Sequence, residues 1–342
     1  MKRSSPLVSI IIVNWNGKHW LEGCLPSLSK VTYKNVEWII VDNGSTDGSI
    51  EWIQKHYSKT VLVSNSENLG FSHANNLGYK EAKGEYILFL NNDTKVAPDY
   101  VTELLKPFET DKTIGGVQSK IYLMDDSTRL DSVGSFLTPT GFLFHNNLGG
   151  KDKKVLDKEI DLYTAKGASM MFRKDVLKKV EVDGWIFDPD YFAYFEETDL
   201  CHRVWLSGYR IVYAYKAVMY HKMGATSKNL ISEWVQFNSF KNRINSYIKN
   251  LGLFNLFLIL PYHIFLCHVS AILFLIKGKI RLAIAIEQSI WWNIQHLKKT
   301  LNARRYIQNK IRAIPDTAFF SIIMRKPGLR YFMNFFRLVS II

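Results

Sequence analysis

The chain contains few cysteines, and they lie far apart. Only three of its 342 residues are cysteine, namely Cys24, Cys201 and Cys267. This number and spacing exclude a small disulfide-stabilised fold and a zinc site built from cysteine pairs, and they favour a reduced, cytosolic setting. The sequence has no internal repeat and no low-complexity segment, and 47% of its residues are hydrophobic, which is enough for a large packed core.

Acidic residues are scarce in the C-terminal part. From Lys241 to Ile342 there are 16 lysines and arginines but only two acids, Glu287 and Asp316. Before residue 241 the chain has 28 basic and 29 acidic residues, so the net charge of +13 belongs to the last hundred or so residues. A basic segment of this kind indicates binding to nucleic acid or to an anionic membrane surface.

Charged residues are absent from Leu251 to Ile276 when histidine is counted as neutral. A helix needs about 20 apolar residues to span a bilayer, so this 26-residue segment is long enough. Pro261, however, is expected to divide it into two pieces that are each too short to span. Aromatic and basic residues alternate after this segment: Trp291, Trp292, Lys298, Lys299, Arg304, Arg305, Phe319, Phe320, Arg325, Lys326, Arg330, Tyr331, Phe332, Phe335, Phe336 and Arg337.

These features predict that residues 229–342 form a helical, basic and aromatic region that associates with the membrane. The uncharged segment argues against nucleic acid as the partner, and aromatic and basic side chains together are typical of interfacial membrane binding. We expect a peripheral or re-entrant attachment to the cytoplasmic face of the cell membrane. A soluble helical subdomain or an oligomer interface is the alternative.

Short apolar runs alternate with helical patterns in the first hundred residues. Strands are predicted at 7–14, 36–42, 61–63 and 87–90, and helices at 19–29, 50–56 and 71–83. This alternation is typical of βαβ units with a parallel sheet, and the first run is too short to be a signal peptide. The predicted strands end in polar residues that we expect at one edge of the sheet, where such folds bind ligands: Asn14, Asp42, Asn65 and Asn91.

The pattern changes after residue 100. Strands are predicted at 115–123, 163–172, 211–215 and 218–220, helices at 173–180 and 196–207, and loops or short hairpins at 125–159.

Two groups of residues have the chemistry of metal ligands. Asn91, Asn92 and Asp93 follow a buried strand, and their oxygens suit a hard cation that carries phosphates. His221 follows a short strand, and its nitrogen together with carboxylate and phosphate oxygens suits Mn²⁺ or Mg²⁺. The alternatives are an Asx turn or helix cap for the first group and a structural histidine for the second.

Three acids are candidates for substrate binding and catalysis. Asp42 could accept the imide N–H of uracil or thymine, or it could cap the helix near Ser49. Glu196 and Glu197 open a predicted helix directly after several aromatic residues. Desolvation by those rings would raise a carboxyl pKa toward the range useful for a general base, whereas the alternative is ordinary helix-dipole electrostatics.

Seven motifs occur in order along the first 225 or so residues: 8–16 (VSIIIVNWN), 41–47 (VDNGSTD), 68–78 (NLGFSHANNLG), 88–93 (LFLNND), 167–171 (GASMM), 196–203 (EETDLCHR) and His221. In this order they resemble the family 2 glycosyltransferases, which are inverting enzymes of the GT-A fold, and especially their rhamnosyltransferase-like branch. The last hundred residues match only in general character.

The resemblance implies a role for each matching residue. Asn14, Asp42, Asn68, Asn91 and Asn92 would bind the nucleotide, and Asp93 and His221 the divalent metal. Glu197 would be the catalytic base, with Glu196 as a rival, and Gly167, Ala168 and Arg203 would belong to the acceptor or diphosphate loop.

The chain departs from the family pattern at two of these positions. Asn91 stands where the family's metal motif begins with Asp, so fewer negative charges face the ion. Glu197 stands where the family has a catalytic Asp, which adds one methylene of reach.

The sequence therefore predicts a GT-A glycosyltransferase domain at residues 1–228, followed by the membrane-associating region. The expected enzyme uses Mn²⁺ or Mg²⁺ and moves a sugar, with rhamnose as one candidate, from a dTDP- or UDP-linked donor to a lipid-linked or polysaccharide acceptor in cell-surface glycan synthesis. A sugar-phosphate nucleotidyltransferase is an alternative, but residues 14–17 (NWNG) are not its glycine-rich basic phosphate loop. A non-catalytic nucleotide-sugar-binding protein is another.

Overall fold

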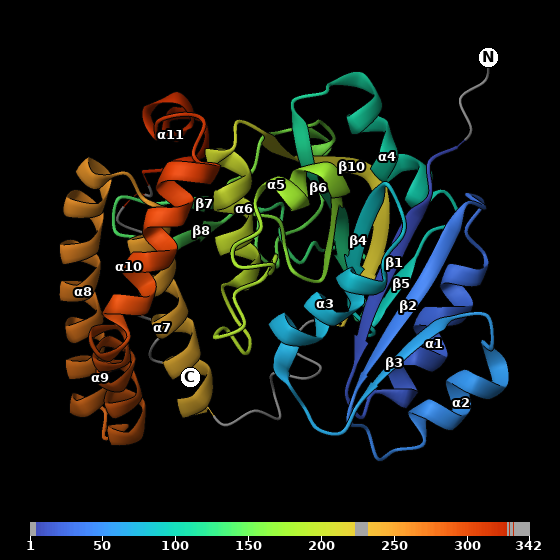
Figure 1. Cartoon of the computed structure of the whole chain (residues 1–342), viewed down its shortest axis with the longest axis horizontal. Coiled ribbons are helices and arrows are strands. Elements are labelled where there is room, and N and C mark those ends of the chain that lie inside the picture. Colours follow the sequence, from blue (N-terminus) through green and yellow to red (C-terminus); the bar gives the residue numbers. More distant parts are fainter. Residues whose placement is uncertain (1–4, 223–231, 327, 329–330, 332–342) are drawn as a thin grey trace.

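The computed structural model describes residues 5–222, 232–326, 328 and 331. An α/β unit and a C-terminal unit made of helices lie side by side (Figure 1). Three of the predicted C-terminal aromatic residues, Phe332, Phe335 and Phe336, lie outside the described residues, as does the predicted domain boundary at 228.

The α/β unit is built on one large sheet of eight strands in the order β3-β2-β1-β4-β9-β6-β10-β5. Four of these come from the first ninety residues: β1 Val8–Asn14, β2 Val36–Asn43, β3 Val61–Asn65 and β4 Tyr86–Leu90. They are mutually parallel, as predicted, so their carboxyl ends meet at one edge. The others are β5 Thr94–Val96, β6 Ile114–Leu123, β9 Ser169–Arg173 and β10 Arg210–His221.

The sheet is mostly parallel but not entirely so. β6 and β10 are parallel, whereas β9 runs antiparallel to both β4 and β6, and the short β5 runs antiparallel to β10. The expected strand at 163–172 begins only at Ser169, because residues 163 and 164 hydrogen-bond the backbone of Ser135 instead. The two strands expected at 211–220 are one strand with a register shift between Ala214 and Val218.

Helices cover both faces of this sheet. One face packs against α1 Lys18–Ser29, α2 Ser49–His56 and α4 Tyr100–Thr110, and the other against α3 Gly70–Glu81, α5 Lys174–Lys179 and α6 Glu196–Leu206. Along β1, Ile10 and Ile12 therefore contact one core while Ile11 contacts the other. Burial on both faces explains why the central strands are continuous apolar runs. A separate hairpin, β7 Ser135–Leu137 and β8 Leu143–His145, lies in the stretch predicted to hold loops or short hairpins.

The C-terminal unit consists of α7 Ser232–Asn250, α8 Leu253–Ile276, α9 Ile280–Gln295, α10 Leu297–Tyr306 and α11 Thr317–Ile323, with a short π-helix at Ile307–Ile311. Helices α8 and α9 stand together at the outer edge of the molecule (Figure 1). The prediction that Pro261 breaks the uncharged segment is wrong, because α8 is continuous through it. The missing N–H of proline leaves only the carbonyl of Phe257 without its helical partner, on the exposed side of the helix.

Candidate active site

The ends of β1 and β2 are joined by side chains. Asn14 and Asp42 are partners in the strand register, and Nδ2 of Asn14 donates to Oδ2 of Asp42 at 3.0 Å. The other oxygen of Asp42 accepts the backbone N–H of Ser45 at 2.8 Å, and both side chains are fully buried. The carboxylate thus stabilises this end of the sheet. Its role in binding a nucleobase stays a prediction.

Asparagines link the neighbouring strand ends. Oδ1 of Asn68 accepts from Nδ2 of Asn43 at 2.8 Å and from the N–H of Gly70 at 3.0 Å, which orders the start of α3. On the other side, Nδ2 of Asn92 donates to Oδ1 of Asn14 at 2.8 Å. The structure therefore brings Asn14, Asp42, Asn68 and Asn92 to one edge. Asn43 was not predicted, although it lies within the strand-end motif.

Asp93 and His221 are neighbours because β5 pairs with β10. His221 is in register with Thr94, the residue after Asp93. Oδ1 of Asp93 lies 3.4 Å from Nε2 of His221. Asp93 is only 5% exposed, yet this oxygen has no hydrogen-bond partner among the described residues. The sequence placed these two residues in one site, and the structure brings them together.

The described residues contain no group of three or more His, Cys, Asp or Glu side chains arranged to hold a metal ion. Asp93 and His221 are two candidate ligands, however, and an Asp93 oxygen that makes no hydrogen bond among the described residues but lies beside a ring nitrogen fits a shared cation. Two protein ligands are the number expected where substrate phosphates and water complete the coordination of Mg²⁺.

Two residues that the sequence did not reveal extend this pair. Nδ1 of His221 donates to Oδ2 of Asp131 at 2.7 Å, and Oδ1 of Asp131 lies 3.2 Å from Nζ of Lys166. Asp131 is fully buried, in the stretch predicted to be irregular, where no pattern marks it. Lys166 directly precedes the predicted motif that begins at Gly167. Its place next to that motif is the feature of the sequence that could have identified it as a site residue.

Electrostatics couple these groups. Burial alone would lower the pKa of His221, but its contacts with Asp131 and Asp93 raise that pKa to about 9. Burial would raise the pKa of Asp131, but His221 and Lys166 lower it to about 2. Asp131 therefore fixes the orientation of the His221 ring, as carboxylates commonly do for metal-binding histidines.

Glu196 and Glu197 begin α6 but have different surroundings. Glu196 is buried and its Oε2 has no hydrogen-bond partner among the described residues, so burial and the neighbouring Glu197 raise its pKa well above the ordinary value. Glu197 is half-buried and lies against Gly167. Burial raises the pKa of Glu197, while its own and Thr198's backbone N–H groups and the charge of Lys166 oppose that shift.

The three residues predicted for the acceptor or diphosphate loop do not all lie at the candidate site. A Cβ added at Gly167 would lie 3.9 Å from Cγ of Glu197, and the carbonyl of Ala168 accepts the N–H of Asn91 at 3.0 Å, so both border the site. Arg203 does not, because it is 1% exposed and its guanidinium is bonded to Asp199 and to the carbonyls of Val180 and Ile186. The structure gives Arg203 a structural role in place of the predicted contact.

Comparisons with known proteins agree on one family. The sequence profile described as Glycosyl transferase family 2 matches residues 9–181, which is half of the chain. The glycosyltransferase GlyA of Streptococcus pneumoniae is 35% identical over 118 residues, which are 33% of this chain and 17% of GlyA. The chondroitin synthase of Pasteurella multocida is 37% identical over 114 residues, which are 33% of this chain and 12% of that protein. The chain thus matches only a small part of these longer relatives.

Solved structures share the fold. The mannosyltransferase PcManGT from Pyrobaculum calidifontis, in complex with GDP-Man and Mn²⁺, aligns with a TM-score of 0.53 over 85% of this chain and 88% of its own, at 17% identity. Residues 1–349 of TarS from S. aureus, in complex with UDP-GlcNAc, align with a TM-score of 0.53 over 75% of this chain and 71% of their own, also at 17% identity. This likeness establishes a GT-A-like α/β fold.

Proposed function

Because the chain belongs to glycosyl transferase family 2, we propose that it is an inverting glycosyltransferase that moves a sugar from a nucleoside diphosphate to an acceptor hydroxyl. The observation that carries the proposal is the row of contacts from Asp93 through His221 and Asp131 to Lys166, which ends beside Glu197. It joins candidate metal ligands to a candidate base at the edge where parallel strands end.

Glu197 is the proposed general base. It is the more exposed of the two glutamates, it borders Gly167, and a raised pKa suits a group that must take up a proton near neutral pH. It removes the proton from the acceptor hydroxyl, whose oxygen attacks the anomeric carbon on the face opposite the diphosphate, and the configuration inverts. Glu196 is buried, and burial together with the charge of Glu197 raises its pKa well above the ordinary value, which makes it the less suitable base.

Asp93 and His221 would hold a divalent cation, Mn²⁺ or Mg²⁺. Bound there, the cation would stabilise the negative charge that develops on the leaving diphosphate. The solved neighbour PcManGT is in complex with Mn²⁺, which supports this part of the proposal. Asn14, Asp42, Asn68, Asn91 and Asn92 are proposed to line the nucleotide site.

The finer proposal concerns substrates. The motif order favours the rhamnosyltransferase-like branch, and therefore a dTDP- or UDP-linked donor with rhamnose as the candidate sugar. The acceptor is proposed to be a lipid-linked or polysaccharide glycan of the cell surface. The chondroitin synthase relative supports an acceptor of the polysaccharide kind.

A thermal-shift panel tests the donor. Nucleoside diphosphates and their sugars, each with and without Mn²⁺, should raise the unfolding temperature where they bind the native state. We expect dTDP or UDP compounds plus Mn²⁺ to give the largest shift. A panel in which no nucleotide shifts the transition would contradict the proposal.

Turnover of the bound donor tests catalysis. Glu197→Gln should lower transfer or donor hydrolysis about 10²–10⁴-fold, as expected for loss of a general base, while the thermal shift with donor is kept. Glu196→Gln serves as the comparison and should retain more activity. Donor binding without turnover by the wild-type protein would favour a non-catalytic nucleotide-sugar-binding protein instead.

We also propose that the outer face of α8 and α9 lies on an anionic membrane surface. Of the 19 large apolar side chains exposed in the described residues, 16 lie between Leu253 and Tyr306. Phe254 and Ile276 are each 75% exposed. The basic residues Lys277, Lys279, Arg281, Lys298 and Arg305 flank this face, as expected for contact with lipid headgroups.

A peripheral position fits α8 better than a spanning one. Within the described residues α8 is the one helix long and apolar enough to cross a membrane by length and composition, and a third of its apolar window is buried in the protein. His263, Cys267 and Phe274 form the buried side, and Nδ1 of His263 lies 3.0 Å from the carbonyl oxygen of Thr140 in the α/β unit. If α8 crossed a membrane, its buried side would have to give up these contacts with the rest of the protein.

A cavity of about 690 Å³ opens beside the same face. Its lining combines Leu253, Phe254 and Leu301 with Arg304, Arg305 and Arg312, and it includes Asp316, which is ion-paired with Arg312. Two arginines, Arg304 and Arg305, remain beside the apolar residues, and an anionic lipid headgroup matches that combination.

Co-sedimentation with vesicles tests the membrane proposal. The protein should bind vesicles that contain phosphatidylglycerol better than vesicles of phosphatidylcholine alone, and added salt should weaken the difference. Replacing Phe254, Phe257 and Ile276 by serine should reduce binding at least tenfold, whereas Val155→Ser, at an exposed apolar residue of the α/β unit, should not. A soluble dimer that the triple substitution dissociates, without vesicle binding, would contradict the proposal.

A further inference from the structure

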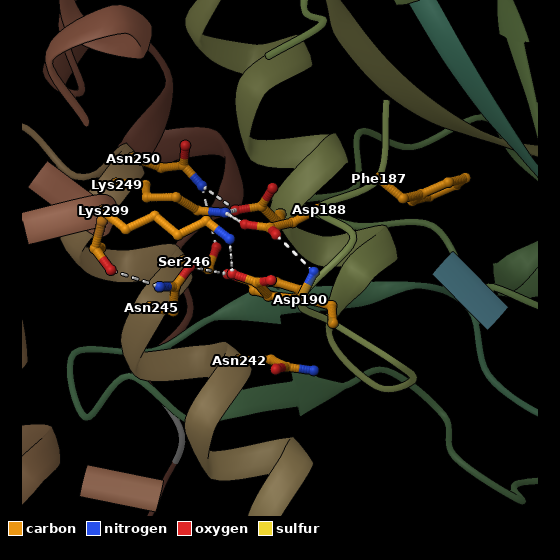
Figure 2. A network of polar contacts seen from close by, with 12 residues as sticks. Phe187, Asp188, Asp190, Asn242, Asn245, Ser246, Lys249, Asn250 and Lys299 are labelled. Atoms are coloured by element: carbon orange, nitrogen blue, oxygen red, sulfur yellow. Dashed lines mark hydrogen bonds and ion pairs between the residues drawn. The ribbon is translucent and has the colours of Figure 1, made fainter. Parts of the chain in front are cut away.

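One side of α7 is polar and buried. Six polar side chains in its second half are almost inaccessible to solvent: Lys241, Asn242, Asn245, Ser246, Lys249 and Asn250. They recur at helical spacing and face the loop before α6, as Figure 2 shows for Asn245, Ser246, Lys249 and Asn250 near Asp188 and Asp190. Buried polar groups cost free energy unless each finds a specific partner, so this contact is not ordinary apolar packing.

The partners of this side belong to the segment that leads into Glu196 and Glu197. Nζ of Lys249 lies 2.6 Å from Oδ2 of Asp188, and Nζ of Lys241 donates to the carbonyl of Asp190 at 2.8 Å. The hydroxyl of Tyr191 donates to Oδ1 of Asn245 at 2.8 Å. Helix α7 therefore holds the loop at three successive points.

Helix α7 also binds the first turn of α6 itself. Nδ2 of Asn250 donates to Oδ1 of Asp199 at 2.8 Å, and Nζ of Lys249 lies 3.2 Å from the same oxygen. Burial would raise the pKa of Asp199, but the charges of Lys249 and Arg203 hold that pKa well below its ordinary value. The start of the helix that presents Glu197 is thus fixed from α7 on its inner side.

Asn242 occupies the decisive place in this contact. Tyr194 and Phe195, the two residues before Glu196, both have left-handed backbone conformations, with φ of 74° and 71°. Such residues cost about 1–3 kcal/mol each and persist only where the surroundings enforce them. Nδ2 of the fully buried Asn242 donates to the carbonyl of Ala193 at 3.0 Å and to that of Tyr194 at 2.6 Å.

We propose that Asn242 is a positioning residue for the transfer reaction, because its amide holds the turn at 193–195 that aims Glu197 into the site. This inference rests on the proposed function. It makes the C-terminal unit part of the active site's support, and assigns α7 a role that membrane attachment alone does not require.

The test compares two buried asparagines. Asn242→Asp keeps the shape of the side chain but replaces both N–H donors by an oxygen that repels the two carbonyls. The matched control is Asn293→Asp on α9, since Nδ2 of Asn293 also donates to two carbonyls, those of Lys241 and Ser289, at 3.0 and 2.9 Å. Both side chains are buried and both have an unpartnered Oδ1 within the described residues.

Turnover of a sugar nucleotide is the first measurement. Asn242→Asp should lower kcat about 10- to 100-fold, as expected when a catalytic group is displaced by about 1 Å, and should leave the donor KM within about twofold. Asn293→Asp should leave both constants within about twofold although it also lowers the unfolding temperature. Unchanged kcat in Asn242→Asp, or equal losses of kcat in both variants, would overturn the inference.

Amide hydrogen exchange is the second measurement, and it does not depend on activity. Segment 190–200 should exchange faster in Asn242→Asp than in the wild type and in Asn293→Asp. If the wild type turns over no sugar nucleotide, the proposed function fails and exchange alone decides: faster exchange confined to Asn242→Asp supports the holding of the turn, and equal exchange overturns it.

Discussion

Lys166 affects both the candidate metal ligands and the candidate base. Its ammonium group lies 3.2 Å from Asp131, which orients His221, and its charge lowers the pKa of Glu197 against the effect of burial. A single cation thus makes it easier for Glu197 to be deprotonated in the resting protein. Burial and the negative charge of Glu197 raise the pKa of Glu196, which makes Glu196 the less suitable base at neutral pH.

The pH dependence of turnover should report this arrangement. Because the pKa of Glu197 is raised in the folded protein, activity should be present above that pKa and should fall as the pH drops through it, with an acidic limb above the ordinary glutamate range. Lys166→Met removes the cation, so the limb should move to higher pH. Measuring kcat as a function of pH for the wild type and for Lys166→Met checks this. If the pH of the acidic limb stayed the same or fell, the limb would belong to a group other than Glu197.

Gly70 shows how one residue connects distant segments. Its φ of 84° is left-handed, and a Cβ added there would lie 2.5 Å from the carbonyl oxygen of Phe192, three residues before Phe195. That carbonyl accepts the N–H of Phe71 at 2.7 Å. The start of α3 therefore contacts the backbone of the same loop that α7 holds at residues 188–194.

Gly70→Ala should both destabilise the fold and disturb this loop. Gly149→Ala is the control, because Gly149 has a φ of 59° but no atom within 4 Å of an added Cβ. The control should cost about 1 kcal/mol from backbone strain alone. Gly70→Ala should cost at least twice as much in urea unfolding and should also lower turnover, and equal costs for the two variants would contradict the close contact.

At the scale of helices and strands, an element could be predicted from the sequence when the interactions that form it are local in the chain. Strands β1 to β4 are buried on both faces, so Ile10, Ile11 and Ile12 had to be apolar together, and this pattern is visible locally. The three-residue β5 exists because it pairs with β10, more than a hundred residues away, and no local pattern predicts such a pairing. Asp131 was missed for the same reason, since its partners His221 and Lys166 are distant in sequence.

Helix α7 illustrates a second limit. The sequence predicts a helical region at 229–342, and α7 spans Ser232–Asn250 within it. Trp234 does pack edge-on against Phe192 and Tyr194. Several residues of α7 that join the two units, however, are polar ones such as Asn242 and Lys249. A polar helix side ordinarily predicts contact with water.

At the scale of the whole molecule, the two units share one hydrophobic core. Phe319 of α11 stacks on Trp205 of α6 at 5.5 Å between ring centroids, and Ile259 of α8 belongs to the cluster that contains β-strand residues of the main sheet. The C-terminal unit is therefore part of the folded core of the molecule and not a separable appendage.

Deleting the chain from Lys249 onward should consequently give an aggregated product. The deletion exposes this core and leaves the buried Asp199 without Lys249, and loss of a buried ion-pair partner typically costs about 3–5 kcal/mol. Size-exclusion chromatography of the truncated chain, with the full-length Phe254, Phe257 and Ile276 serine variant as the soluble comparison, checks this. A monomeric truncated protein that still shows a nucleotide-dependent thermal shift would contradict it.

The polar side of α7 also has a consequence for evolution and for engineering. Asp188 and Asp190 meet Lys249 and Lys299 across the junction of the two units, so a change on one side calls for a matching change on the other. Among homologues, segment 188–199 should covary with α7 more strongly than with strands β1 to β4. Chimaeras that exchange tails between relatives should work only when both segments are inherited from the same parent.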